Sequence, residues 1–485
     1  MIRLKRLFFL ATVALLTSVQ LYAGTDTGYN IKIKIAPLKD SVIYFANYFG
    51  DKQYIQDSAK CDDGSWVSFK GKEKLSGGIY LVVMPGKKYF ELIIDKEQNF
   101  IVETDVADPV KSMIVKNSND NKIFYEYLNF VSGKQKEAEG LQKQFALAKS
   151  KSDSTEIQTK LSEVSKSVTS YKEKFMADNP DMLLSKIFST SREPEVPEIP
   201  SLPDGTKDST FAFRYYKSKY LDNVDFSDSR LLRTPLFHTK LDTYIKKLTV
   251  QIPDSINKEA DMLVSKAKSN KEVFKYVVWY LTNQYETSNI MGMDAVFVHM
   301  VNNYYTREQA TWIDSVQLYK IQERAKILEP ILLGKKVQNL TLEDTLGNYK
   351  SLHNVKANYT VLVFWEPDCG HCQKTIPKIK LIYDKVKAKG VEVYAVDTET
   401  EMDKLKKFIK EKNLNWINVA DPNLHNNFRY EFDINTTPQI FLLDENKKII
   451  AKKIDAKTLE DILEKKLNME IDVVPADDDK HAESH

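Results

Sequence analysis

Two of the chain's three cysteines are separated by two residues, at a place where their sulfurs could exchange a disulfide. Cys369-Gly370-His371-Cys372 follows an apolar run that ends at Trp365 and opens a stretch with helical spacing. The first sulfur therefore falls at a helix N-terminus, where unpaired N–H groups and the helix dipole favour a thiolate. The second lies one turn further along the same face, within reach for a disulfide.

These positions predict separate roles in thiol–disulfide exchange. We expect Cys369 to be the exposed nucleophile and Cys372 the resolving thiol, which closes the disulfide and expels the partner. Gly370 would let a substrate backbone approach. His371, when protonated, would add positive charge near the thiolate and make the couple more oxidising. The charge of Asp368 opposes thiolate formation unless this residue caps the helix.

Other chemistries of a Cys pair fit the spacing less well. A zinc knuckle needs four ligands, and no second Cys pair exists. Covalent haem attachment needs His directly after the second Cys, where Gln373 stands. A peroxiredoxin stays open as an alternative, although its peroxidatic Cys is not normally part of a close pair. We expect no metal and no cofactor.

Length and composition limit the number of domains and the class of protein. A chain of 485 residues is expected to form roughly three domains. Charged residues make up 28% and hydrophobic residues 42%, an ordinary mix for soluble globular proteins. The net charge of +2, from 70 basic and 68 acidic residues, gives no reason to expect nucleic acid as a partner.

Residues 1–23 have the pattern of a signal peptide. Basic residues at the start precede an apolar run from Leu7 to Val19, and Ala23 supplies a small-residue cleavage site, with a bulky Leu21 two positions before it. The run is too short for a spanning helix, and an uncleaved anchor is the alternative. No cysteine follows the run, so we do not expect a lipoprotein. We expect export to the periplasm or cell envelope, with no integral membrane domain after cleavage.

The region before the Cys pair divides into parts in which the apolar residues recur at different spacings. Residues 28–108 alternate with period two between turn signals, which predicts a small antiparallel β domain, a sandwich or a barrel. We expect the third cysteine, Cys61, to be a half-buried strand residue; a resolving or mixed-disulfide role is the alternative.

Residues 117–332 change to helical spacing, and a Pro-rich loop at 193–203 interrupts them. We expect the helical hairpin at the start of this domain to break at Gly133 and again near Ser152. The aromatic residues after 205 are interpreted as core or groove residues.

Residues 334–467 alternate between strands and helices, which predicts an α/β domain. A hairpin is expected to begin at Val337 and a helix to cover 421–430. The acidic tail at 471–485 is expected to be disordered. The whole chain is thus predicted to be multidomain, with a small antiparallel β domain, a helical middle domain and a C-terminal α/β domain.

Trp365, the Cys-Gly-His-Cys motif, Pro377 and Thr437-Pro438 follow in an order that resembles the thioredoxin superfamily, over about residues 334–467. The added hairpin and helix look like the periplasmic thiol–disulfide oxidoreductases of the cytochrome-maturation type. The resemblance implies a thioredoxin-like domain in which Thr437 and Pro438 form a cis-proline loop. It also implies that Trp365, Gly370, Thr437 and Pro438 bind substrate. The β and helical domains resemble uncharacterised domains of envelope proteins from some Gram-negative bacteria.

Three positions depart from the pattern of that superfamily. Val363 replaces a buried acid on the strand, Thr375 replaces a Glu after the second Cys, and Asp368 replaces a Trp. The proton acceptor for Cys372 must then be another group, and Glu366 is the best candidate nearby.

Two functions from different classes follow. The first is an exported thiol–disulfide oxidoreductase, whose partners are cysteine-containing envelope proteins and a membrane electron donor or acceptor. The second is an envelope binding or scaffold protein that uses its helical domain, with the Cys pair a local disulfide. The motif resembles that of protein disulfide isomerase, so we predict a couple more oxidising than thioredoxin, while the direction of exchange stays open.

Overall fold

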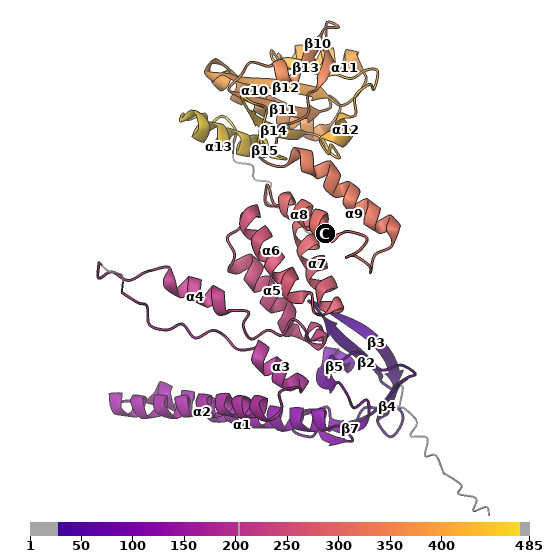
Figure 1. Ribbon diagram of the computed structural model, residues 1–485, viewed down its shortest axis with the longest axis vertical. Coiled ribbons are helices and arrows are strands. Elements are labelled where there is room, and N and C mark those ends of the chain that lie inside the picture. The colour runs from indigo at the N-terminus through magenta and orange to yellow at the C-terminus, as the bar shows by residue number, and fades with distance from the viewer. Residues whose placement is uncertain (1–27, 202–203, 476–485) are drawn as a thin grey trace, which may run out of the picture. The chain divides into compact units, whose positions relative to one another are not determined.

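The computed structural model describes residues 28–201 and 204–475, and the chain divides into two compact units. One unit contains the residues up to Arg192 together with Arg230–Leu236; the other contains Glu193–Ser229 and the chain from Phe237 onwards. Figure 1 labels the elements of both. The expected signal peptide at 1–23 and most of the expected tail, from 476, lie outside the described residues.

The first unit begins with two four-stranded sheets, in the orders β4-β1-β7-β8 and β3-β2-β5-β6. Alternation builds them: Ile31, Ile33 and Ile35 of β1 are buried, and the intervening lysines face outwards. The β domain is confirmed, but β1 and β7 pair in parallel, so it is not wholly antiparallel. The strands are β1 (Tyr29–Ala36), β2 (Val42–Phe49), β3 (Lys52–Lys60), β4 (Trp66–Gly71), β5 (Gly78–Val83), β6 (Tyr89–Ile94), β7 (Asn99–Asp105) and β8 (Ile114–Lys116).

Three helices complete the first unit: α1 (Asn119–Leu147), α2 (Lys151–Asp178) and α3 (Leu183–Thr190). The expected break at Gly133 is wrong, since α1 continues through it. A single glycine costs a helix only about 1 kcal/mol, and just before it the rings of Tyr127 and Phe130 stack on that of Tyr171 in α2. The turn lies at 148–150, and Ser150 caps α2 by accepting a hydrogen bond from Asp153 N–H.

The second unit starts with six helices whose aromatic residues form much of their core, among them Tyr276, Tyr280 and Phe297. Within residues 28–201 and 204–475, no helix combines the length and hydropathy needed to cross a membrane. The helices are α4 (Phe211–Lys219), α5 (Pro235–Lys247, whose first residues belong to the other unit), α6 (Pro253–Ala267), α7 (Lys271–Glu286), α8 (Asp294–Tyr304) and α9 (Ser315–Leu328).

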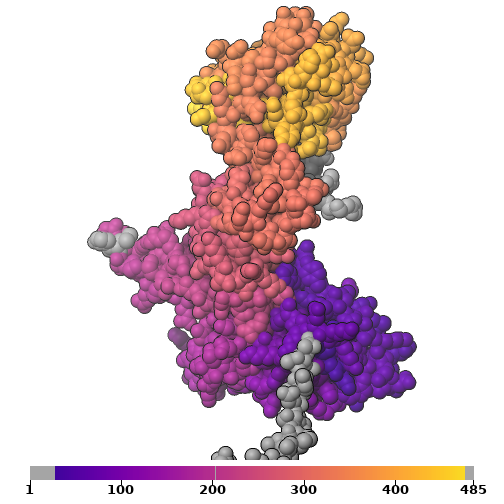
Figure 2. All heavy atoms as spheres, turned by 45° about the vertical axis from the view of Figure 1, so that its right-hand side comes forward, coloured from indigo at the N-terminus to yellow at the C-terminus, as the bar shows by residue number. Residues whose placement is uncertain are grey.

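The C-terminal domain contains a seven-stranded mixed sheet in the order β10-β9-β13-β12-β11-β14-β15. Its orange and yellow atoms form one body in the space-filling view (Figure 2). Its strands are β9 (Thr341–Asp344), β10 (Tyr349–Ser351), β11 (Tyr359–Trp365), β12 (Val391–Asp397), β13 (Ile417–Ala420), β14 (Gln439–Asp444) and β15 (Ile449–Lys452). Its helices are α10 (Gly370–Val386), α11 (Met402–Lys412), α12 (Phe428–Glu431) and α13 (Ala456–Leu467). This α/β domain confirms the predicted fold class.

Three local expectations about this domain differ from the structure. The hairpin strand begins at Thr341 and not at Val337, and only 428–430 of the stretch 421–430 is α-helical. Residues 471–475, included in the expected tail, are ordered against the domain. Ile471 and Val474 are buried in its core, and the Glu460 carboxylate accepts hydrogen bonds from the N–H groups of Val473 and Val474. Because the tail is rich in acidic residues, its composition predicted disorder and did not single out these two apolar residues.

Candidate functional site

Cys369 is the N-cap residue of α10, directly after the loop that leaves β11. Its sulfur accepts a hydrogen bond from the Cys372 N–H at 3.3 Å, and its side chain is partly exposed. Burial raises the pKa of the Cys369 thiol, but hydrogen bonds from Cys372, Thr437 and the His371 N–H outweigh it. The pKa of Cys369 therefore lies below its ordinary value, as a nucleophilic thiol requires.

Cys372, one turn along α10, is in the opposite state. Its side chain is 0% exposed and packs with Trp365 and Ile376 in the core of the domain. Burial, followed by its hydrogen bond with Cys369, raises the pKa of Cys372 to about 12. One sulfur of the pair is thus poised to attack a partner, whereas the other is held as a thiol beneath it.

Thr437-Pro438 lies beside the pair. The Cys369 thiol donates to the Thr437 carbonyl at 3.4 Å, and the Thr437–Pro438 peptide bond is cis. A groove of about 580 Å³ runs along this loop; we call it the redox groove. The residues lining it are 433, 435–440 and 453–455, with His371 and Thr375 of α10 on the other side.

The remaining predicted site residues, His371 for redox tuning and Gly370 and Trp365 for substrate binding, lie at different depths. His371 is exposed and lines the redox groove. At Gly370 nothing lies within 4 Å of where a Cβ would stand, so the backbone there is open to an approaching chain. Trp365 is fully buried, with its ring 5.0 Å from that of Phe408. Its predicted contact with substrate is wrong for this structure, because strand alternation turns its side chain under α10.

The two acids before Cys369 are both engaged elsewhere. Asp368 does not cap α10; its carboxylate pairs with Lys404 at 2.7 Å, which offsets its charge beside the thiolate. The Glu366 carboxylate accepts hydrogen bonds from the Thr398 hydroxyl at 2.6 Å and from Arg429 at 3.3 Å. Glu366, the predicted proton acceptor for Cys372, therefore already has two hydrogen-bond donors.

Sequence reasoning missed another candidate for the proton acceptor, Asp397, at the end of β12. It pairs in register with Trp365, and Val393 and Ala395 before it belong to the core beneath α10, so alternation places Asp397 on that same face. It is 1% exposed, and its Oδ2 has no hydrogen-bond partner. Burial, then the nearby charges of Glu399, Glu366 and Asp368, raises the pKa of Asp397 to about 7. The sequence signal that could have found Asp397 was an acidic residue at the end of an apolar strand.

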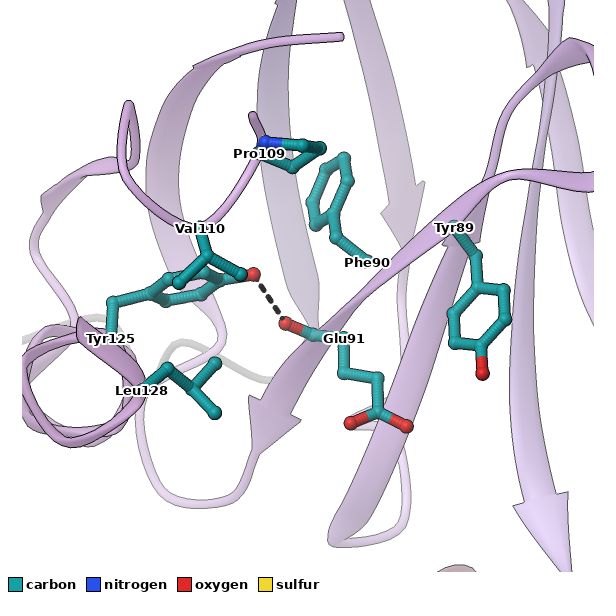
Figure 3. Close-up of a pocket in the computed structure, with 7 residues that line it drawn as sticks. All are labelled: Tyr89, Phe90, Glu91, Pro109, Val110, Tyr125 and Leu128. Atoms are coloured by element: carbon teal, nitrogen blue, oxygen red, sulfur yellow. Dashed lines mark hydrogen bonds between the residues drawn. The ribbon is translucent and has the colours of Figure 1, made fainter. Parts of the chain in front are cut away.

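The β domain contains a pocket of about 270 Å³ between β6 and the start of α1 (Figure 3). The Tyr125 hydroxyl donates to the Glu91 carbonyl at 2.7 Å across it, and Phe90 and Leu128 supply apolar walls. No cysteine or histidine lines this pocket. Cys61 is elsewhere in the same unit, just after β3, and is buried and not half-buried as expected.

The C-terminal domain matches a family model. Residues 333–452 match the AhpC/TSA family. The thiol-disulfide oxidoreductase ResA of Bacillus cereus is 28% identical over 134 residues, which are 28% of this chain and 76% of that protein. A thioredoxin-like protein of Haemophilus influenzae is 30% identical over 119 residues, 24% of this chain and 67% of that protein. The chain belongs to the thioredoxin-like proteins.

This membership confirms the resemblance inferred from the Cys-Gly-His-Cys motif. The thioredoxin-like domain is a thiol–disulfide oxidoreductase domain with the pair Cys369 and Cys372. A solved domain from Cytophaga hutchinsonii, described as a possible thiol-disulfide isomerase, is 45% identical; the match covers 29% of this chain and 97% of that one, with a TM-score of 0.27. Residues 29–124 and 146–329 match two domains of unknown function, DUF4369 and DUF5106.

Proposed function

We propose that the protein is an exported thiol–disulfide oxidoreductase that exchanges its Cys-Gly-His-Cys disulfide with cysteines of envelope proteins. The observation that carries this proposal is the asymmetry of the pair. Cys369 is accessible with a lowered thiol pKa, and Cys372 is buried with a pKa raised to about 12. Export rests on the basic and apolar pattern of residues 1–23.

In the reductive direction, the Cys369 thiolate attacks one sulfur of a substrate disulfide. A mixed disulfide forms, and the second substrate sulfur leaves as a thiolate that takes a proton from water. Cys372 then loses its proton and attacks the Cys369 sulfur, which releases the first substrate sulfur and leaves the enzyme oxidised. Two electrons pass from the Cys pair to the substrate, and the same steps in reverse oxidise a dithiol.

The surrounding residues support these steps by position. Thr437 and Pro438, beside Cys369, supply the backbone edge along which an extended substrate segment would lie. His371 faces the same groove and, once protonated, favours the thiolate and thus the reduced enzyme. Asp397 is the buried carboxyl that we assign as the proton acceptor for Cys372, since its pKa near 7 lets it change protonation at neutral pH.

Reduction of insulin disulfides by the full chain, with a dithiol as electron source, tests the proposal. Wild type should reduce insulin at a rate at least about 1,000-fold above that of the Cys369→Ser variant, as expected when a nucleophile is removed. Cys61→Ser is the matched control and should keep the wild-type rate. A wild-type rate no higher than that of Cys369→Ser would favour the scaffold function instead.

A trapping variant would identify the envelope proteins that exchange disulfides with this protein. Cys372→Ser leaves Cys369 able to attack but removes the thiol that resolves the mixed disulfide. In the native envelope this variant should accumulate mixed disulfides on Cys369, and mass spectrometry would identify the proteins attached. Absence of adducts above those of the Cys369→Ser, Cys372→Ser double variant would contradict envelope clients.

A further inference from the structure

The last helix of the helical domain contacts the segment that leads into the cis-proline loop. Arg324 of α9 donates to both oxygens of Asp433, at 2.5 Å from Nη1 to Oδ1 and at 3.0 Å from Nη2 to Oδ2. Its neighbour Glu323 accepts a hydrogen bond from the Tyr430 hydroxyl. Two consecutive residues of α9 thus hold residues on and just after α12, and Figure 1 shows α9 approaching this side of the domain.

Asp433 is a buried carboxylate with several donors. It is 4% exposed, and besides Arg324 it accepts hydrogen bonds from Lys453 Nζ and Asn435 Nδ2, both at 2.8 Å. Burial raises the pKa of Asp433, but the hydrogen bonds from Arg324 and Lys453 outweigh it and keep the group ionised. A bidentate Arg–carboxylate pair also fixes direction, because two parallel bonds define the plane of the carboxylate.

The carboxylate held in this way belongs to the wall of the redox groove. Asp433, Asn435 and Lys453 line the groove together with Thr437, whose carbonyl accepts from Cys369. The loop is also closed at its base, where Gln439 Nε2 donates to the Phe432 carbonyl at 3.1 Å. The position of Asp433 therefore sets the position of the loop that a substrate would meet.

The same short segment contacts the Cys loop on its other side. Arg429 of α12 donates to Glu366, three residues before Cys369, and to the Thr398 carbonyl at 3.0 Å. A second link joins the helical domain to β15, where the Lys452 ammonium donates to Asp294 and to the Ile331 carbonyl. Lys452 is itself buried. The helical domain is thus ionically bonded to the redox domain at two places, one of which adjoins the groove.

We propose that Arg324 is a positioning residue of the redox site, which holds Asp433 and thereby keeps the cis-proline loop in the shape that binds a peptide substrate. The inference rests on the proposed function, since it assigns the groove to a peptide. It gives the helical domain a role in exchange, because Arg324 of α9 binds a carboxylate in the loop of the thioredoxin-like domain. Without Arg324, a buried carboxylate would keep Lys453 as its main countercharge, and the loop would move to hydrate it.

The experiment compares full-length variants in insulin reduction and in alkylation of Cys369 by iodoacetamide. Arg324→Gln should raise KM for insulin by about tenfold, since small displacements of a binding wall weaken substrate positioning. Its alkylation rate should stay within about twofold of wild type, because this small reagent does not use the groove. Arg324→Lys should give a smaller rise in KM, because an ammonium keeps the charge but not the bidentate geometry.

Lys326→Gln is the matched control, since Lys326 lies on the same helix with a largely exposed side chain paired to Glu323. It should match wild type in both assays. Asp433→Asn combined with Arg324→Gln should be no worse than the poorer single variant, because both act through one contact. An unchanged KM in Arg324→Gln, an equal effect of Lys326→Gln, or a parallel loss of alkylation in Arg324→Gln would overturn the proposal.

A readout independent of activity separates this inference from the proposed function. In the reduced full chain, amide hydrogen exchange at residues 433–439 should become faster in Arg324→Gln than in Lys326→Gln. If wild type fails to reduce insulin but this difference is present, the proposed function is wrong and the contact with the loop still holds. If wild type reduces insulin and exchange at 433–439 is unchanged in Arg324→Gln, the positioning role is wrong.

Discussion

Cys61 in the β domain and Cys369 in the thioredoxin-like domain carry the same thiol in different surroundings. Cys61 follows a strand end and is buried, and burial together with the charge of Asp62 raises the pKa of its thiol. Cys369 caps a helix, where several hydrogen-bond donors lower the pKa of its thiol. The difference shows that reactivity comes from the number of donors facing the sulfur and from access, and not from the residue type.

A second contrast lies within the redox domain itself, between groups above and below the start of α10. Cys369 has access to solvent and to the redox groove, whereas Cys372 and Asp397 lie in the core. Burial raises the pKa of both buried groups, to about 12 for the Cys372 thiol and to about 7 for the Asp397 carboxyl, whereas the pKa of the Cys369 thiol is lowered. The variants below test these contrasts in order of decreasing effect.

The largest effect is expected at Asp397. Its pKa in the folded protein, about 7, lies above the ordinary value of about 4, so the folded state holds a proton that the unfolded state releases between these pH values. Stability should therefore fall as pH rises from about 4 to 7. Asp397→Asn removes this cost and should stabilise the domain at pH 8 by up to about 4 kcal/mol.

Urea unfolding of the full chain, followed by hydrogen exchange of β11 amides, measures this gain at pH 4 and pH 8. Glu445→Gln is the control, because Glu445 is an exposed acid of the same domain that does not contribute to the raised pKa of Asp397. A gain of equal size at both pH values, or no gain at pH 8, would contradict a buried proton-holding carboxyl. Asp397→Asn should also slow the resolution of mixed disulfides by Cys372.

His371→Pro should have the next largest effect. Loss of an imidazole that can become charged beside the thiolate removes a stabiliser of the reduced form, so the couple should become more reducing. We expect a shift of about 30 mV, equivalent to a tenfold change in the equilibrium constant of this two-electron couple. Equilibration of the full chain with glutathione at pH 7 measures it, and an identical potential in the variant would show that His371 does not tune the pair.

The smallest effect is expected at Cys61. Cys61→Ala removes one buried sulfur from the β domain and should destabilise that domain by about 1 kcal/mol, as the loss of a small buried group does. Insulin reduction should be unaffected. A fall in activity without a fall in stability would give Cys61 a part in exchange, and the contrast with Cys369 would no longer hold.

The sequence was sufficient for the features that are local. Helix-start chemistry predicted Cys369 at a helix N-terminus, and alternation predicted both the strands of the β domain and the core strands beside the redox pair. Gly133 was judged by propensity alone, and tertiary packing overrode it. Trp365 was assigned from the motif, whereas its place in the strand determines that it faces the core.

Contacts between residues far apart in the sequence could not be predicted from local patterns. Asp397 lies close to the redox helix only because β12 pairs with β11, and Arg324 meets Asp433 across 109 positions of chain. Nothing in spacing or composition selects one arginine for one aspartate at that separation. These are also the groups that adjust the site, so the sequence predicted the reacting sulfurs better than the residues that position and protonate them.

The most direct test of this account is the pH dependence of alkylation at each cysteine of the reduced full chain, measured by iodoacetamide labelling and mass spectrometry. We predict that Cys369 reacts first, with a midpoint below the ordinary thiol value of 9.0, while Cys61 reacts above that value and Cys372 only near 12. If Cys369 reacts no faster than Cys61 at pH 7, the start of α10 does not activate its thiol and the central claim is wrong.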